Sequence, residues 1–282
     1  MIAFINPSAT SGGHGRHSSV ISGAGVGIGI DKVGTGTVTL TGVNTYTGTT
    51  TVSAGTFALT GVGALASTDI DISNGGTLQT DGSALADGSD IDIAAGGTLD
   101  IDGSENLGAT STLDLNGAGA LVDIAAGQTL SVGTITTADG STVTINAGAT
   151  LAGLGNTINN GGVMNVADTG SVTDAGAINN LVTGVYNFAG AATFDSDSDN
   201  AGAEQITNDG QINLNGNNTQ IVNIGPNGNN DLLNQNAGQV ELLSNLVFEA
   251  CRSCGDLVGV CSFNSVFERD ACDDFGQVIK AA

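Results

Sequence analysis

Apolar residues alternate with polar or small residues in short runs along most of this chain, and Gly or Asn ends nearly every run. The pattern is sharpest in residues 32–61, where it predicts three β-strands, at 37–40, 49–52 and 56–59. A period of two places the apolar side chains of a strand on one face. The pattern therefore predicts an all-β protein whose strands each bury one face.

Copies of the same unit return at a fixed spacing. Thr77-Leu78 returns 21 residues later as Thr98-Leu99, and each copy follows a Gly pair. Gly supplies the positive φ that a sharp corner needs. We expect Asn to take the same role at later corners, such as Asn159-Asn160 before Gly161, with its amide bonded to the next rung. The spacing predicts a solenoid of about 20–21 residues per rung, with rungs about 4.8 Å apart and a rod on the order of 50 Å long.

The most regular segment resembles the passenger-associated repeat of bacterial autotransporters. Val38 and Phe57 stand where that repeat usually has Leu. The positions that match are Lys32, Gly34, Gly36, Thr37, Thr39, Leu40, Gly42, Asn44, Thr45, Tyr46, Thr47, Gly48, Thr50, Val52, Gly55 and Thr56. The full motif occurs once, and a weaker resemblance continues to about Gly238. The resemblance implies a right-handed parallel β-helix, exported through the outer membrane by a C-terminal β-barrel translocator of the parent protein.

Changes in composition divide the chain into three parts. We expect a Gly- and Ser-rich N-terminal segment or cap at 1–32, with one strand near 26–30, a parallel β-helix at 33–240, and a tail or cap at 241–282. The tail holds all four Cys residues and four of the eight Phe residues. Insertions at 195–200 and 225–230 interrupt the rungs, and we expect 195–200 to be a solvated loop.

The chain has a formal net charge of −23. A surface this acidic repels nucleic acid and anionic membranes. We find neither a secretory signal at the N-terminus nor an apolar run long enough for a membrane helix. We therefore expect an extracellular or cell-surface protein that neither binds nucleic acid nor inserts into a membrane, and a chain that is a fragment of a longer passenger.

Several Asp residues alternate with apolar residues and so face outward. The 21-residue period stacks Asp69 on Asp90 and Asp71 on Asp92, about one rung apart. Carboxylates at that distance repel each other unless a cation lies between them. These four residues are the candidates for Ca²⁺ binding, and the alternative is a solvated acidic face that keeps the rod soluble.

The four Cys residues form the other candidate site, at Cys251, Cys254, Cys261 and Cys272. The first pair has the spacing of a zinc knuckle, whereas the second pair is too widely spaced for one. Disulfides or free structural thiols are the alternative in an exported chain, and an error in the reading frame of the tail is a third.

No catalytic constellation is found. Gly13-His14-Gly15 matches one short motif of the polygalacturonases, but their other motifs are missing downstream. We expect a passenger stalk for adhesion or display, without catalysis or a cofactor, which binds host or matrix surface molecules, including glycans. Two alternatives stay open: a pectinase-like carbohydrate-active enzyme, and a self-associating matrix or surface-binding solenoid. The Thr runs that would favour the latter are confined to the first rungs.

Overall fold

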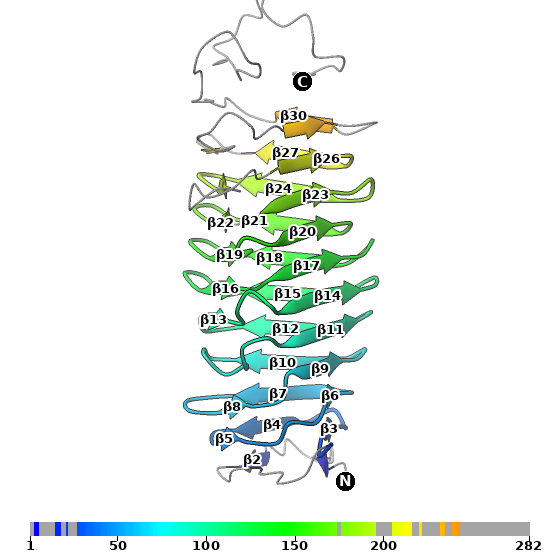
Figure 1. The fold of residues 1–282 in the computed structure, drawn as a ribbon, viewed down its shortest axis with the longest axis vertical. Helices are drawn as coiled ribbons and strands as arrows, with labels where there is room; N and C mark the ends of the chain where they lie inside the picture. The colour runs from blue at the N-terminus through cyan, green and yellow to red at the C-terminus, as the bar shows by residue number, and fades with distance from the viewer. Residues whose placement is uncertain are drawn as a thin grey trace, which may run out of the picture.

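The computed structural model describes residues 3–5, 15–17, 21, 27–173, 176–195, 205–215, 220–221, 232–234 and 239–242. The regular elements in these residues are all strands, and the strands pair in parallel in four sheets. The chain winds upward from one rung to the next, with the N-terminal strands at one end of a rod and β30 near the other (Figure 1). The predicted all-β parallel solenoid is confirmed.

Two long sheets run the length of the rod. The first sheet holds β1 (Ala3–Ile5), β3 (Ile30–Lys32), β6 (Thr50–Val52), β9 (Asp69–Ile72), β11 (Asp90–Ala94), β14 (Thr112–Asn116), β17 (Thr134–Thr137), β20 (Thr157–Asn160), β23 (Ala177–Asn180), β26 (Gln205–Asn208) and β29 (Leu232–Asn234). The second sheet holds β2 (Gly15–His17), β4 (Thr37–Leu40), β7 (Gly55–Leu59), β10 (Gly76–Thr80), β12 (Thr98–Ile101), β15 (Leu121–Ile124), β18 (Thr142–Ile145), β21 (Val163–Val166), β24 (Val185–Ala189), β27 (Gln211–Asn215) and β30 (Gln239–Leu242).

The third side of the rod carries two shorter sheets. The small sheet has β5 (Val43–Asn44) and β8 (Ala64–Leu65). The third-side sheet has β13 (Glu105–Asn106), β16 (Thr129–Ser131), β19 (Thr150–Ala152), β22 (Ser171–Thr173), β25 (Thr193–Asp195) and β28 (Gln220–Ile221). Each rung therefore contributes one strand to each long sheet, and most rungs add a short strand on the third side.

The register of the long sheets repeats the sequence period. Ile70 pairs with Ile91 and Leu78 pairs with Leu99, and both pairs are 21 residues apart. The predicted rung length is thus confirmed in this part of the rod. Further on, Ala177 pairs with Gln205, an offset of 28 residues, so this rung is longer. The extra length falls where the sequence predicts an insertion, although 196–200 lie outside the described residues.

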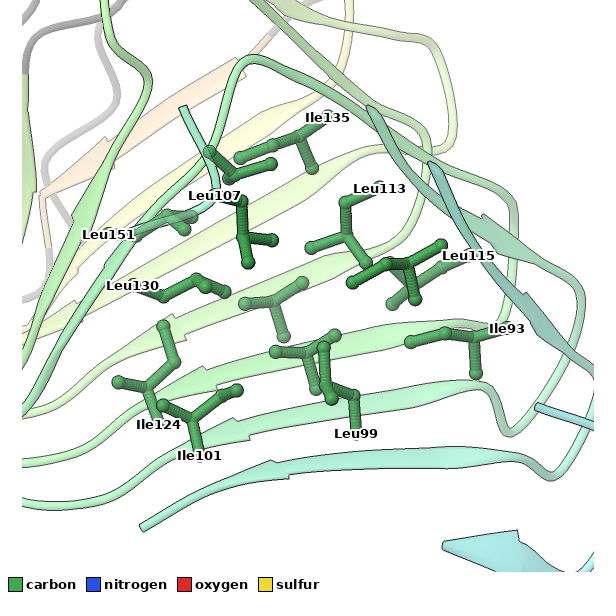
Figure 2. Packing of buried hydrophobic residues seen from close by; sticks show 14 of the residues in the cluster. Ile93, Leu99, Ile101, Leu107, Leu113, Leu115, Ile124, Leu130, Ile135 and Leu151 are labelled. Carbon is green, nitrogen blue, oxygen red and sulfur yellow. The ribbon is translucent and has the colours of Figure 1, made fainter. Parts of the chain in front are cut away.

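The core is a set of apolar rows that run along the rod. Ile70, Ile91, Leu113 and Ile135 pair in succession on the first sheet and are all buried. Side chains from neighbouring rungs lie over one another inside the solenoid, as the pair Ile101 and Ile124 shows (Figure 2). Fully burying a side chain of this size contributes about 1.5–3 kcal/mol. The stacking of each rung on its neighbours is therefore what stabilises it.

The N-terminal region adds strands that the sequence did not predict. β1 pairs with β3 and β2 pairs with β4, so the paired sheets extend to Ala3. The strand predicted near 26–30 begins only at Ile30, because Gly27 takes a left-handed backbone conformation with φ of 89°. Residues 243–282, and with them most of the predicted tail, lie outside the described residues.

Asn has a different place from the one predicted. Among the described residues other than Gly, positive φ occurs at Ser83, Leu154 and Thr169, and at no Asn. Asn160 instead ends strand β20 and points into the solenoid, where it is buried. The left-handed corner role expected for Asn159-Asn160 is therefore wrong, because both residues belong to the strand and the chain bends after it, at Gly161 and Gly162, without a positive φ. The expected bond of the amide to the next rung is confirmed, since the Nδ2 of Asn160 donates to Asn180 Oδ1 at 2.9 Å.

One interior row has polar members on both sides of an apolar centre. The row occupies the last inward position of the first sheet, and its central members, Val52, Ile72, Ile93 and Leu115, are apolar. On the N-terminal side of this centre lies Lys32, whose buried Nζ donates to the carbonyls of Gly34 and Ala54 at 2.7 Å each. On the other side lies a ladder in which each side chain bonds the next, formed by Thr137, Asn160, Asn180 and Asn208.

No helix among the described residues has the length and apolar character that a membrane span needs.

Candidate functional site

The outer face of the first sheet carries a row of carboxylates. Asp71 pairs with Asp92, and Asp92 pairs with Asp114, so the three lie on successive rungs. Asp69 and Asp90 form a second pair beside them. The stacking predicted from the 21-residue period is confirmed, and Asp114 extends it by one rung. At this separation of about 4.8 Å the side chains feel each other's charge strongly.

Polar groups of adjacent rungs bind these carboxylates. The hydroxyl of Thr49 donates to Asp69 Oδ2 at 2.6 Å, and the amide of Asn116 donates to Asp92 Oδ1 at 2.6 Å. Thr112 donates to Asp90. All of these donors are neutral, so they orient the carboxylates without cancelling their charge.

The pKa values of the row reflect that unbalanced charge. Partial burial raises the pKa of Asp71, and the charges of Asp69, Asp92 and Asp90 raise it further. Partial burial also raises the pKa of Asp114, although its hydrogen bond with Thr136 acts in the opposite direction. The sequence contains no Lys or Arg between residues 33 and 251 that could offset these charges. This face therefore presents concentrated negative charge to solvent.

The second sheet carries a shorter carboxylate row. Asp100 pairs with Asp123 on the next rung, and the amide of Gln79 donates to Asp100 at 3.2 Å and to Asp102 at 2.7 Å. Partial burial raises the pKa of Asp100, and the charges of Asp102 and Asp123 add to that effect. Asn146 donates to Asp123 at 2.6 Å from the rung above. Acidic rows therefore lie on both long sheets over the same rungs.

Further along the rod the same outer positions change from carboxylates to amides. On the second sheet Asn187 donates to Asn165 at 2.8 Å, and Asn213 donates to Asn187 at 2.7 Å. On the first sheet Asn179 donates to Asn159 at 2.9 Å. Each amide uses its neighbour on the adjacent rung as a partner, which is the amide ladder known from stacked β-structures. The rod thus has an acidic segment followed by a neutral, amide-lined segment.

A row of hydroxyls lies beside the second acidic row. Thr37, Thr56, Thr77 and Thr98 pair in succession on β4, β7, β10 and β12. The sequence showed Thr runs in the first rungs only, because the later members of this row are single Thr residues in different local motifs. The row ends at Leu121, which pairs with Thr98. It therefore spans a limited part of the rod.

The four Ca²⁺ candidates lie together as predicted, but in rows and not around a centre. Within the described residues no group of three or more His, Cys, Asp or Glu side chains is arranged to hold a metal ion. Cys251, Cys254, Cys261 and Cys272 lie outside the described residues, as does His14. Their roles as zinc ligands, disulfides or catalytic groups stay predictions.

A shallow hollow of about 250 Å³ lies on the first sheet near its N-terminal end. Its lining includes Asp31 and the hydroxyl-bearing Thr49 and Thr51, with Gly27, Gly29 and Gly48 around them. The Asp31 carboxylate already accepts a hydrogen bond from Ser53 at 2.7 Å. The hollow is therefore only weakly polar and holds no convergent set of catalytic groups.

Comparison with known families finds a match in the N-terminal part of the rod. The family model of the passenger-associated-transport-repeat matches residues 30–59, which form β3, β4, β5, β6 and β7. No curated protein and no solved structure matches the chain. The matched family implies display outside the cell and a translocator in the parent protein. Residues 30–59 match the passenger-associated-transport-repeat, and this match together with the β-solenoid fits a repeat fragment of an autotransporter passenger.

Proposed function

We propose that this chain is a non-catalytic stalk, displayed at the cell surface or released from it, that adheres to host or matrix molecules through its outer polar faces. The observation that carries the proposal is the unbroken stacking of two 11-stranded parallel sheets around a passenger repeat. Such a stack has no need of a ligand to complete its core, and its outer faces remain for contact with other molecules.

The amide rows are the best candidates for adhesion. Asn165 and Asn187 lie on successive rungs of the second sheet and each side chain is partly exposed. A repeating row of neutral hydrogen-bonding groups suits a repeating neutral partner such as a glycan, because many weak contacts add up along the row. The acidic rows would repel an anionic polymer.

The rows of carboxylates suit a display role better than an enzymatic one. A glycosidase needs an acid and a second carboxyl group on either side of one bond of a bound sugar. Here Asp71, Asp92 and Asp114 lie side by side along one face of a sheet. We therefore propose that these carboxylates keep the rod charged and soluble, and we assign a catalytic role to no residue.

Binding of the purified chain to arrays of glycans and to immobilised matrix proteins tests the adhesive role. We expect binding that falls at least about tenfold in the variant Asn165→Ala/Asn187→Ala, since two hydrogen-bonding positions are lost. The matched control is Asp71→Ala/Asp92→Ala on the other sheet, which removes two outer polar side chains without adding an amide and should bind as the wild type does. Equal binding by all three proteins, or none by any, would contradict the adhesive role.

Two further measurements address the rest of the proposal. Antibodies against the solenoid should label intact cells that express the parent protein, or detect it in the medium. Detection only after lysis would refute surface display. Release of reducing ends from pectin-type polysaccharides would favour the enzyme alternative, and concentration-dependent assembly in sedimentation experiments would favour the self-associating one.

A further inference from the structure

The third side of the rod is interrupted at one rung. The small sheet ends at β8, and the third-side sheet begins at β13. Between them lies the segment 81–89, which contains no strand although it forms the third side of its rung. The backbone N–H groups of this segment cannot all find partners in a regular ladder, and a buried N–H without a partner is destabilising.

The side chain of Glu105 supplies acceptors at this break. Its carboxylate accepts hydrogen bonds from the N–H of Ala84, at 2.9 Å to Oε1 and 3.1 Å to Oε2, and from the N–H of Leu85 at 3.4 Å. On the other side, the N–H of Leu65 in β8 donates to the carbonyl of Ala84 at 2.7 Å. On the Glu105 side, the N–H of Ser83 also donates to the carbonyl of Ser104 at 3.1 Å and the N–H of Gly88 to the carbonyl of Leu107 at 2.6 Å. The carboxylate therefore holds the middle of the segment, at Ala84 and Leu85, between two backbone hydrogen bonds.

Glu105 occupies a position that is apolar in the rungs above. It pairs with Leu130, which pairs with Leu151, and all three are buried. Glu105 itself is only 1% exposed. Burial raises its pKa, while the hydrogen bonds from the amides of Ala84 and Leu85 act to lower it. A carboxylate in an apolar row is unfavourable unless its hydrogen bonds compensate for lost water, and here they do so only while the segment is closed.

We propose that the hydrogen bonds of Glu105 keep the third side closed at 81–89. When they break, this segment opens locally while the two long sheets stay closed. The long sheets run past this rung without a break, through β9, β11 and β14 on one side and β10, β12 and β15 on the other. Opening would expose the interior at Leu85 and Leu107, which are buried in the closed form. Local opening controlled by Glu105 is thus a conformational property that the repeat pattern alone does not predict.

Hydrogen exchange of the full chain, followed by mass spectrometry, tests whether Glu105 holds the segment 81–89 closed. In Glu105→Ala, the amides of 83–88 should exchange about ten- to a hundredfold faster than in the wild type. The amides of β11 and β12 should keep their wild-type rates. Glu105→Gln retains the size and one acceptor oxygen, so it should show a smaller increase at the same amides, and it serves if Glu105→Ala does not fold.

Ser141→Ala is the matched control. Ser141 is also buried, and its hydroxyl donates to the carbonyl of Ala138 at 2.6 Å, so its loss affects a corner further along the rod. We expect this variant to leave the exchange of 83–88 unchanged. Faster exchange along the whole rod in the Glu105 variants would show that Glu105 is an ordinary part of the core. Unchanged exchange at 83–88 would show that its hydrogen bonds do not hold the segment. Either result overturns the proposal.

Discussion

At the scale of single residues, the two buried charged side chains were hard to foresee. The strand Ile30-Asp31-Lys32 places Lys32 on the inner face by simple alternation, which is a signal that sequence reading could have used. Glu105 gives no such signal, because the break that it fills is created by the irregular segment one rung below. Sequence reading treats a charged residue as exposed by default, and that default fails where backbone groups need a partner.

Lys32 links two corners of the passenger repeat through its hydrogen bonds to the carbonyls of Gly34 and Ala54. Lys32→Met keeps most of the side-chain volume but leaves these buried carbonyls without a donor. We expect the free energy of unfolding to fall by about 2 kcal/mol. Denaturant titration of both proteins measures the change. A Met variant as stable as the wild type would show that the amine contributes nothing, and Thr35→Ala, at an exposed position between the corners, should be neutral.

Two glycines are required for different reasons, one because the neighbouring rung is too close for a side chain and the other because of its backbone conformation. A Cβ at Gly103 would lie against the carbonyl of Asp81 on the rung below, whereas a Cβ at Gly127 would meet no atom within 4 Å. Gly127 has a left-handed φ of 72°. Gly103→Ala should cost about 3 kcal/mol of stability or prevent folding, and Gly127→Ala about 1 kcal/mol. Equal losses in thermal unfolding would contradict the rung spacing at Gly103.

At the scale of elements, the strands were the most predictable part. The strand predicted at 37–40 is β4, with the same bounds, and the Thr-Leu repeat gave the pairing of β10 with β12. These two predictions succeed because a half-buried strand shows its alternation of apolar and polar residues directly in the sequence. The individual strands of the third side could not be placed from the sequence, since some are only two residues long and carry too few alternations to detect.

The Asn ladder shows why the corners were only partly predictable. Asn next to Gly suggests a turn, but Asn160 and Asn180 lie at strand ends and bond each other inside the rod. The sequence of one rung cannot tell these cases apart, because the inward amide becomes favourable only when the next rung supplies a second amide. The acidic rows were predictable because the sequence of a single rung is enough to show them. Asp71 and Asp92 each alternate with Ile, which places both side chains on the outer face.

Asn180 is the central member of the interior ladder. Its amide donates to Asn208 Oδ1 at 2.7 Å and to the carbonyl of Gln211 at 3.1 Å, and its Oδ1 accepts from Asn160. Asn180→Val removes these three hydrogen bonds and should lower the free energy of unfolding by about 2–3 kcal/mol. Asn179→Val, on the outer face of the same strand, is the control and should cost much less. Similar losses for both variants in denaturant titrations would refute the ladder's contribution.

At the scale of the whole molecule, the acidic rows make stability depend on pH. Folding raises the pKa of Asp71, Asp100 and Asp114 above the ordinary value of 3.8, so the folded state binds protons more tightly than the unfolded state. The contribution of these groups to the free energy of unfolding is therefore greatest below that value and is lost as the pH rises through the folded pKa values.

The expected result is that these three groups make the rod more stable near pH 4 than near pH 7, the reverse of ordinary acid denaturation. The triple variant Asp71→Asn/Asp100→Asn/Asp114→Asn should show a flatter profile, with its gain in stability concentrated at neutral pH. Denaturant midpoints between these pH values give the profile. Asn159→Ala, in the same outer row as Asp71 and Asp114, removes no carboxyl group and should keep the wild-type pH dependence. A triple variant with an unchanged profile would contradict the assigned cause.

Successive rungs stack in register along one rod, so residues of one outer row lie at a regular spacing. Asp71, Thr136, Asn159 and Asn179 belong to one outer row, in which each paired strand adds one rung. The Cα distances from Asp71 to the other three should be about 14, 19 and 24 Å, rising by one rung spacing each time.

The most direct test is pulsed electron paramagnetic resonance on spin labels at these positions. The variants are Asp71→Cys combined in turn with Thr136→Cys, Asn159→Cys and Asn179→Cys, in a chain whose four native cysteines are replaced by serine. If the rungs stack in this register, the mean distance between the two spin labels should increase by about 5 Å from each pair to the next. Distances that do not increase in this order, or that are too broad to assign, would contradict a solenoid with this register.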